Sequence, residues 1–208
     1  MPRRPRTPRQ PKQERSRFLA DAVVEAAARV VREVGWSRAK VGRIAKVAGV
    51  SVGSLYRYFP GRDVLLGAVI DRALARDSEA FEAALQRLDG GTIEESLRSF
   101  IDALVGDDRL TDPRLLRHLV DVLDAAGRLE TVRTLFDGMV RRFAERLVET
   151  HPELGPIAVV ERRSHIAFWG LRSAFVARVR VEDPFDLPAF REDAEVTLHA
   201  LLRTPATR

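Results

Sequence analysis

The sequence predicts an all-α protein of about nine helices, and three observations indicate this fold class. Apolar residues recur at helical spacing through most of the 208 residues, and no segment of useful length alternates polar and apolar residues as a half-buried strand does. Glycine, proline and capping residues divide the periodic segments into pieces of helical length. With 45% hydrophobic residues, the chain has enough apolar surface to form a core.

The chain begins with a predicted arm and a long helix. Residues 1–13 contain four prolines and five Lys or Arg, so we expect a flexible basic arm there. A first helix should follow from about residue 14 to Val34 and stop at Gly35. Its apolar face is formed by residues at helical spacing, which are Phe18, Val23, Ala26 and Val30.

A tight turn separates the next two predicted helices. Gly49 can take the positive φ that ends the second helix, and the Ser51 hydroxyl can cap a third helix of about Val52–Tyr58. Two short helices joined by a Gly-containing turn form a helix-turn-helix, so we assign residues 14–60 to this unit. Its core should contain small and apolar residues packed against the first helix, namely Ile44, Ala45, Ala48, Val50, Leu55 and Phe59.

Residues 61–208 predict a second domain that is also entirely helical. Asp112 is placed to cap one of its helices, with Pro113 at the first helical position. The expected helices cover about residues 62–88, 92–105, 113–127, 129–150, 156–179 and 188–203.

The charge is divided unevenly between these parts. Residues 1–60 contain 14 Lys or Arg and 4 Asp or Glu, a net charge of +10, whereas residues 61–208 contain 21 and 26, a net charge of −5. The basic excess extends beyond the arm, through Arg38, Lys40, Arg43, Lys46 and Arg57. A basic first domain on an acidic body favours a polyanionic partner for the first domain alone.

Several classes of protein are disfavoured. The absence of cysteine excludes disulfides and thiolate chemistry, and it suits the reducing cytoplasm. The four histidines show no metal-ligand spacing, and motifs for nucleotide binding or a nucleophile elbow are absent, so we expect no cofactor, no metal and no enzymatic activity, although sequence leaves a Ser-His-Asp arrangement open. No apolar run approaches the roughly 20 residues of a membrane span, and the basic arm lacks the apolar segment of a secretory signal.

One segment of the sequence indicates the class of protein. Residues 35–66 read GWSRAKVGRIAKVAGVSVGSLYRYFPGRDVLL. This string resembles the DNA-binding domain of the TetR family of bacterial regulators, and it keeps the family spacing without a gap. The matching positions are Gly35, Trp36, Ile44, Ala45, Ala48, Gly49, Val50, Ser51, Gly53, Leu55, Tyr56, Tyr58, Phe59, Asp63, Leu65 and Leu66. The resemblance implies a transcriptional regulator whose C-terminal helical domain binds a small molecule and dimerises.

Departures from the family pattern affect the caps. Ala39 and Lys40 replace two threonines, which removes a cap and a phosphate hydrogen bond; we expect Ser37 to cap the second helix and Lys40 to contact a phosphate. Val52 replaces a frequent Lys or Arg, and Gly61 replaces a capping Ser or Asn.

The third helix should lie in the major groove of duplex DNA. There Val52 would meet a thymine methyl, Ser54 a base or a phosphate, and Arg57 either a guanine or the backbone. Arg43 would reach a base edge or a phosphate, and the resemblance implies backbone contacts for the two tyrosines and Arg62. The full set of candidate DNA-binding residues is Lys40, Arg43, Ser51, Val52, Ser54, Tyr56, Arg57, Tyr58 and Arg62. The arm either inserts into the minor groove or remains a solvated tail.

The last two helices predict a homodimer. The helix at about 156–179 is apolar on nearly every side, and the helix at about 188–203 has a wide apolar face. One subunit cannot cover both, so we expect a two-fold, four-helix interface and a palindromic operator.

The resemblance also implies a small-molecule inducer that releases the operator. The candidate ligand-binding residues are Phe100, His118, Phe136, Met139, His165, Trp169 and Arg172. The last three lie on one helical face, although ordinary core packing is the simpler reading of each aromatic residue. The lining suggests a flat or apolar ligand with one anionic group.

Three functions therefore compete on sequence. The first is a repressor, or with the same DNA-binding domain an activator, that responds to a ligand. The second is a helical carrier or enzyme with an incidental basic N-terminus. The third is an architectural DNA binder without an inducer.

Overall fold

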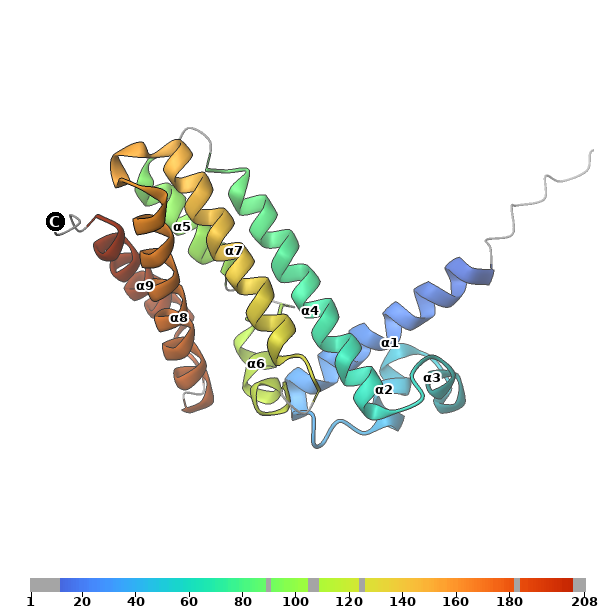
Figure 1. The fold of residues 1–208 in the computed structure, drawn as a ribbon. Helices are drawn as coiled ribbons and strands as arrows, with labels where there is room; N and C mark the ends of the chain where they lie inside the picture. The colour runs from blue at the N-terminus through green and yellow to red at the C-terminus, as the bar shows by residue number, and fades with distance from the viewer. Residues whose placement is uncertain (1–11, 89–90, 105–108, 124–125, 182–183, 204–208) are drawn as a thin grey trace, which may run out of the picture. The chain divides into compact units, whose positions relative to one another are not determined.

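The computed structural model describes residues 12–88, 91–104, 109–123, 126–181 and 184–203 (Figure 1). Within these ranges the chain contains nine α-helices, two short 3-10 helices and no strand, which confirms the all-α fold class. The predicted arm at residues 1–13 lies almost wholly outside the described residues. The chain divides into two compact units, the first ending at Val69 and the second beginning at Ile70.

The first unit contains the predicted helix-turn-helix. It consists of α1 (Lys12–Val34), α2 (Val41–Ala48), α3 (Val52–Tyr58) and the first residues of α4 (Arg62–Leu85). Helices α1, α2 and α3 pack on one another. The buried residues that join them include Val23, Ala26, Val30, Ile44, Ala45, Leu55 and Phe59. The core predicted from sequence is therefore confirmed at these positions, and Ala48 and Val50 are half-buried.

Phe18 is a correction to the predicted core. Its side chain is 74% exposed, although it lies at the spacing of the apolar residues of α1. The buried part of α1 begins at Val23, more than one helical turn later. Periodicity places a residue on a face of the helix, but it does not show how far along that face the packed helices extend.

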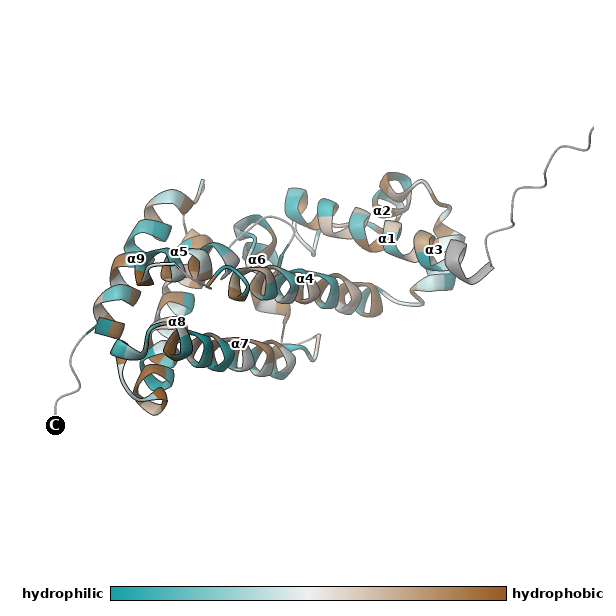
Figure 2. Cartoon of the chain, turned by 90° about the horizontal axis from the view of Figure 1, so that it is seen from above, coloured by the Kyte–Doolittle hydropathy of each residue, from teal (hydrophilic) through white to brown (hydrophobic). Residues whose placement is uncertain are grey.

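The second unit continues from α4 and is built from longer helices. It contains α5 (Ile93–Leu104), α6 (Pro113–Leu119), η1 (Val120–Val122), α7 (Leu129–Thr150), η2 (Pro152–Leu154), α8 (Ile157–Val181) and α9 (Leu187–Arg203). Helix α8 packs on α6, α7 and α9, and α9 also packs on α5 (Figure 1). Apolar and polar residues alternate around α4 and α7, as amphipathic helices require (Figure 2).

Two local features illustrate how sequence sets these helices. Asp112 caps α6 by accepting a hydrogen bond from the Arg114 backbone N–H at 2.9 Å, as predicted. The single helix expected at 113–127 is incorrect, because α6 ends at Leu119 and a 3-10 turn follows. This turn has the sequence Val-Asp-Val, and β-branched residues and Asp are weak helix formers.

Candidate nucleic-acid interface and ligand-binding residues

The turn between α2 and α3 has the geometry that the sequence predicted. Gly49 takes φ +67° in the left-handed region, and its N–H donates to the Lys46 carbonyl at 3.2 Å. The Val50 N–H donates to the Ala45 carbonyl at 3.0 Å, which closes the end of α2. A side chain at position 49 would be strained by this φ, even though a Cβ there meets no atom within 4 Å.

The start of α3 is capped by Ser51. Its Oγ accepts a hydrogen bond from the Ser54 N–H at 3.0 Å and donates to the Ser54 Oγ at 2.9 Å. The predicted cap of α2 is wrong, because the N-cap residue is Lys40 and not Ser37, and Lys40 makes no side-chain cap. Ser37 lies in the turn that follows α1, before the N-cap position of α2. Lys40 occupies that position and keeps its side chain exposed.

Helix α3 has one buried side and one exposed side. Leu55 is 1% exposed and the following Phe59 is 8% exposed, so both anchor the helix in the core. Val52 and Tyr56 are 43% and 47% exposed, and Arg57 is exposed as well. Such large groups on the outer side of a seven-residue helix are available to a partner rather than to the core.

Gly53 leaves the outer side of α3 open. A Cβ at this position would meet only the Ser51 Oγ, at 3.9 Å. Among the described residues, no other segment approaches this position closely.

Three candidate arginines have partners within the first unit. The Arg43 guanidinium forms a 2.5 Å ion pair with Glu33 of α1. Arg62 donates to the Trp36 carbonyl and lies over the Trp36 ring, with 4.7 Å between Cζ and the ring centroid. The Arg57 Cζ lies 5.4 Å from the centroid of the Tyr58 ring. Of these three arginines, Arg43 is the one that pairs with a carboxylate in the described residues, and the exposed Arg57 keeps its charge available outward.

Three of the seven candidate ligand-binding residues are buried in the core of the second unit, and the other four are half-buried. Phe100 is buried and stacks on Phe143 at 3.8 Å between ring centroids. Phe136 and Met139 of α7 are also buried, whereas His118 of α6 is half-buried. Their burial agrees with ordinary core packing, the simpler of the two readings that the sequence allowed.

The three candidates on α8 meet α7 at two points. The Trp169 indole N–H donates to Asp137 at 2.9 Å, and His165 Nε2 lies 3.7 Å from the same carboxylate oxygen. Arg172 is directed to Phe136, with its Cζ 4.4 Å from the ring centroid. The structure therefore places all three side chains toward α7, and it gives His165 and Trp169 a shared polar partner that the sequence had not indicated.

A buried carboxylate in the same region was missed by sequence reasoning. Asp77 of α4 is 2% exposed and accepts hydrogen bonds from the Leu110 N–H at 3.1 Å and the Thr111 hydroxyl at 3.0 Å. Burial raises its pKa from 3.8 to about 7, against the opposing effects of the Thr111 hydrogen bond and of the Arg109 and Arg172 charges. Scattered acidic residues on helices resemble solvated faces in a sequence, so no local signal marks Asp77.

This raised pKa predicts that the protein becomes more stable as the pH falls from 8 to 6. Folding favours protonated Asp77, so its contribution to stability is fully present below its unfolded pKa and is lost as the pH rises through about 7. We expect Asp77 to add about 1 kcal/mol between pH 8 and pH 6, or ~3 °C in Tm. Melting curves of wild type and Asp77→Asn at both pH values measure the difference.

The control is Glu79→Gln, which changes an exposed carboxylate on the same helix. It should keep the wild-type difference between the two pH values, whereas Asp77→Asn should reduce it. An equal pH dependence in wild type and Asp77→Asn would show that Asp77 does not titrate in this range.

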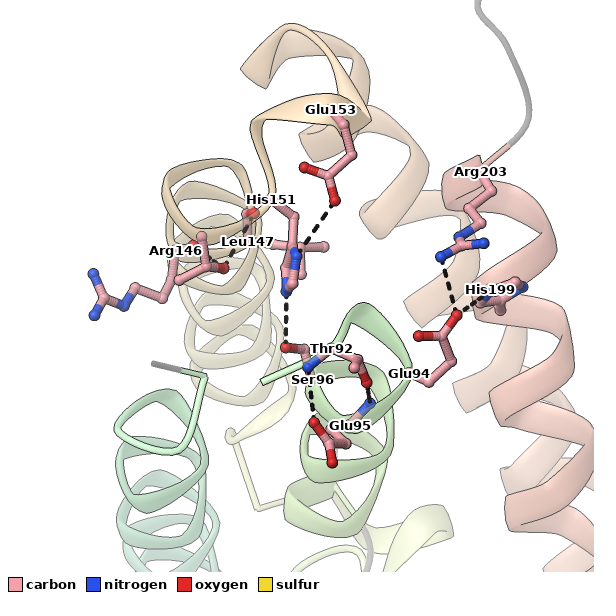
Figure 3. Close-up of polar contacts among 11 residues, drawn as sticks. Thr92, Glu94, Glu95, Ser96, Arg146, Leu147, His151, Glu153, His199 and Arg203 are labelled. Carbon is pink, nitrogen blue, oxygen red and sulfur yellow. Dashed lines mark hydrogen bonds and ion pairs between the residues drawn. The ribbon is translucent and has the colours of Figure 1, made fainter. Parts of the chain in front are cut away.

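A second polar cluster joins the start of α5 to α7 and α9 (Figure 3). The buried Ser96 hydroxyl lies 3.2 Å from Nε2 of His151, whose Nδ1 lies 3.5 Å from Glu153. Nearby, Glu94 accepts from His199 at 3.1 Å and pairs with Arg203 at 3.0 Å. Ser96, His151 and Glu153 follow one another as the members of a nucleophilic triad do. Ser96 is only 2% exposed, however, so a substrate cannot reach its oxygen. The cluster ties helices together.

Three surface grooves of 620, 320 and 260 Å³ are found in the second unit. The first lies between α5 and α9, the second beside the start of α6, and the third between α4 and α7. Of the candidate ligand-binding residues, only Met139 lines one of these grooves, the third.

The described residues contain neither a cluster of metal ligands nor a membrane-spanning helix. No group of three or more His, Asp or Glu there is arranged to hold a metal ion. No helix in the same residues combines the length and the apolar character needed to cross a membrane.

A helix-turn-helix whose second helix is exposed is typical of proteins that bind the major groove of DNA. Residues 23–69 match the sequence profile described as "Bacterial regulatory proteins, tetR family". The matched segment covers the helix-turn-helix of the first unit, so this domain resembles the DNA-binding domain of that family. The family resemblance inferred from residues 35–66 is thereby confirmed.

Individual relatives agree with this assignment. The chain is 30% identical over 134 residues to the HTH-type transcriptional repressor KstR of Mycolicibacterium smegmatis, covering 62% of this chain and 64% of KstR. It is 36% identical over 83 residues to the HTH-type transcriptional regulator BetI 2 of Chromohalobacter salexigens, covering 40% of this chain and 38% of that protein. The matches therefore span less than two thirds of these curated relatives.

Solved structures show the same fold along more of the chain. A TetR-family regulator from Mesorhizobium loti superposes with a TM-score of 0.65 and 15% sequence identity, covering 90% of this chain and 96% of the other. The fold along most of this chain is thus shared with that structure.

Proposed function

We propose that this protein is a transcriptional regulator that acts in the cytoplasm as a homodimer and represses its target genes by binding a palindromic operator. A small apolar molecule bound to the second unit would release the DNA. The observation that carries the proposal is the exposed outer side of α3, with Val52, Tyr56 and Arg57, in a unit that matches a family of bacterial regulators.

The charge of the first domain supports a DNA partner. Residues 1–60 have a net charge of +10 whereas residues 61–208 have −5, so the charge that attracts a polyanion is concentrated on residues 1–60. Lys40, at the start of α2, and Lys46, within α2, are both exposed. They can add contacts to the DNA backbone to the contacts that α3 makes.

An uncovered apolar strip supports the homodimer. On α8, the exposed residues with small or apolar side chains recur at helical spacing, and they are Ile166, Gly170, Ala174, Ala177 and Val181. On α9, Val196 is 66% exposed and Ala200 is also exposed. Small residues allow two helices to approach closely, so this strip fits a second copy of the same helices.

Arg57 tests the DNA-binding role directly. Duplexes bound by the wild-type protein would first be selected from a random pool, and the affinity of Arg57→Ala for the winner would then be measured. We expect a loss of about 1–3 kcal/mol and relaxed specificity at one base position, because a bidentate arginine contact to guanine contributes that much discrimination.

The matched control is Arg29→Ala, an exposed arginine of α1 in the same unit. It should bind the selected duplex as wild type does. Failure to select any sequence would count against an operator-binding regulator, and unchanged affinity and specificity in Arg57→Ala would count against the role of that residue alone.

A further inference from the structure

The second unit contains a guanidinium that the chain itself leaves poorly compensated. Arg172 of α8 is half-buried, and its contacts are the face of the Phe136 ring at 4.4 Å and a longer-range attraction to Asp77. Within the part of the chain that the structure describes, it forms no hydrogen bond and no ion pair. Desolvation lowers the pKa of Arg172, which is the expected cost of enclosing a cation without a close anion.

Asp77 does not supply that anion. Both of its carboxylate oxygens are already engaged, Oδ1 by the Thr111 hydroxyl and Oδ2 by the Leu110 N–H. The pKa of Asp77 is also about 7, so near neutral pH its carboxyl group is uncharged in a large fraction of the protein molecules. Other arginines of this unit differ, since Arg128 and Arg142 each have two hydrogen bonds to a carboxylate.

The surroundings of Arg172 are apolar and partly accessible. Trp169 lies one helical turn before it and Val176 one turn after it on α8, so their side chains share its face. Both are half-buried, as is Arg172, so each keeps surface that a small molecule can contact. A ring face on one side, an indole, an aliphatic side chain and an unfilled fork of N–H donors together select a molecule with an apolar body and a planar anion.

We propose that Arg172 binds the carboxylate of an apolar organic acid and that this class of acid is the effector of the regulator. The inference deepens the proposed function and depends on it for the effector role. The guanidinium fork can hold two oxygens of either a carboxylate or a phosphate, but a carboxylate fits better here because the neighbouring Asp77 would repel a second negative charge whenever it is ionised.

The experiment measures the thermal stability of the full chain without DNA, with two acids and their neutral counterparts. The probes are decanoate with decanamide, and 2-naphthoate with 2-naphthamide. Each acid should raise the Tm by ~5 °C or more at about 100 times its Kd, and each amide by clearly less. Arg172→Met keeps the apolar contact but loses the fork, so it should bind the acids about tenfold or more weakly and respond equally to acid and amide.

The matched control is Arg162→Gln, which removes an exposed arginine from the same helix and should keep the wild-type preference for acids. Arg172→Lys, which keeps the charge without the fork, provides a second variant with an intermediate preference. Equal shifts from acid and amide in the wild-type protein, or no shift from either acid, would overturn the proposal. A larger shift from octyl phosphate than from both acids would replace the carboxylate by a phosphate.

DNA release separates this inference from the function on which it depends. If the acids bind but leave the selected duplex bound, Arg172 keeps its place as an anion site and the effector role is refuted. If the duplex is released by a neutral compound and not by the acids, the regulator stands and the carboxylate assignment is refuted.

Discussion

The affinity for a selected duplex is expected to fall about 10³- to 10⁵-fold when the salt concentration rises from about 50 to about 200 mM. Binding by the first unit releases counterions from each phosphate that a cation replaces, and roughly 6–10 such contacts would produce this slope. The exposed cations Lys40, Lys46 and Arg57 are among those available. The measurement is a titration of fluorescent duplex at a series of salt concentrations.

Single variants make the salt prediction specific. Lys40→Ala should lower the slope of log affinity against log salt by ~1, because one phosphate contact is lost. Arg87→Ala changes an exposed arginine of the second unit and should leave the slope unchanged. A flat response of the wild-type protein to salt would refute the first unit as a DNA-binding surface.

The second large effect is expected from Ala174→Glu in the strip on α8. Ala174 is exposed in the single chain, so the substitution should leave the fold of the subunit intact. In a dimer the carboxylate would be buried against a copy of the same apolar strip, where an unpaired charge costs several kcal/mol. We expect a monomer in sedimentation experiments and an affinity for the palindrome that is lower by about 10²-fold or more, because linked binding to two half-sites is lost.

Ala75→Glu is the matched control, since it adds the same charge at an exposed alanine of α4. It should remain dimeric and bind DNA as wild type does. A dimeric Ala174→Glu would show that another surface joins the subunits, and a monomeric wild-type protein would remove the basis for a palindromic operator.

Local residues determined much of the fold and of the proposed DNA-binding surface. The turn at Gly49, the cap at Ser51 and the cap at Asp112 each depend on the conformation or hydrogen bonding of neighbouring residues, so a sequence is enough to place them. The limits of α3 follow from the same signals. The errors occurred where local signals are weak, as for the cap expected at Ser37, or where the packed helices end, as at Phe18.

The body of the protein shows the complementary case. Apart from the break after Leu119, the sequence by itself determined its helices, and it determined the wide apolar faces of α8 and α9, because periodicity within one helix fixes which residues share a face. Only the tertiary structure decided that Asp77 is buried, that Arg172 meets Phe136 instead of a carboxylate, and that Ile166 and Val196 remain uncovered. These properties depend on which helices become neighbours, and burial and charge compensation are set by contacts between residues far apart in the chain.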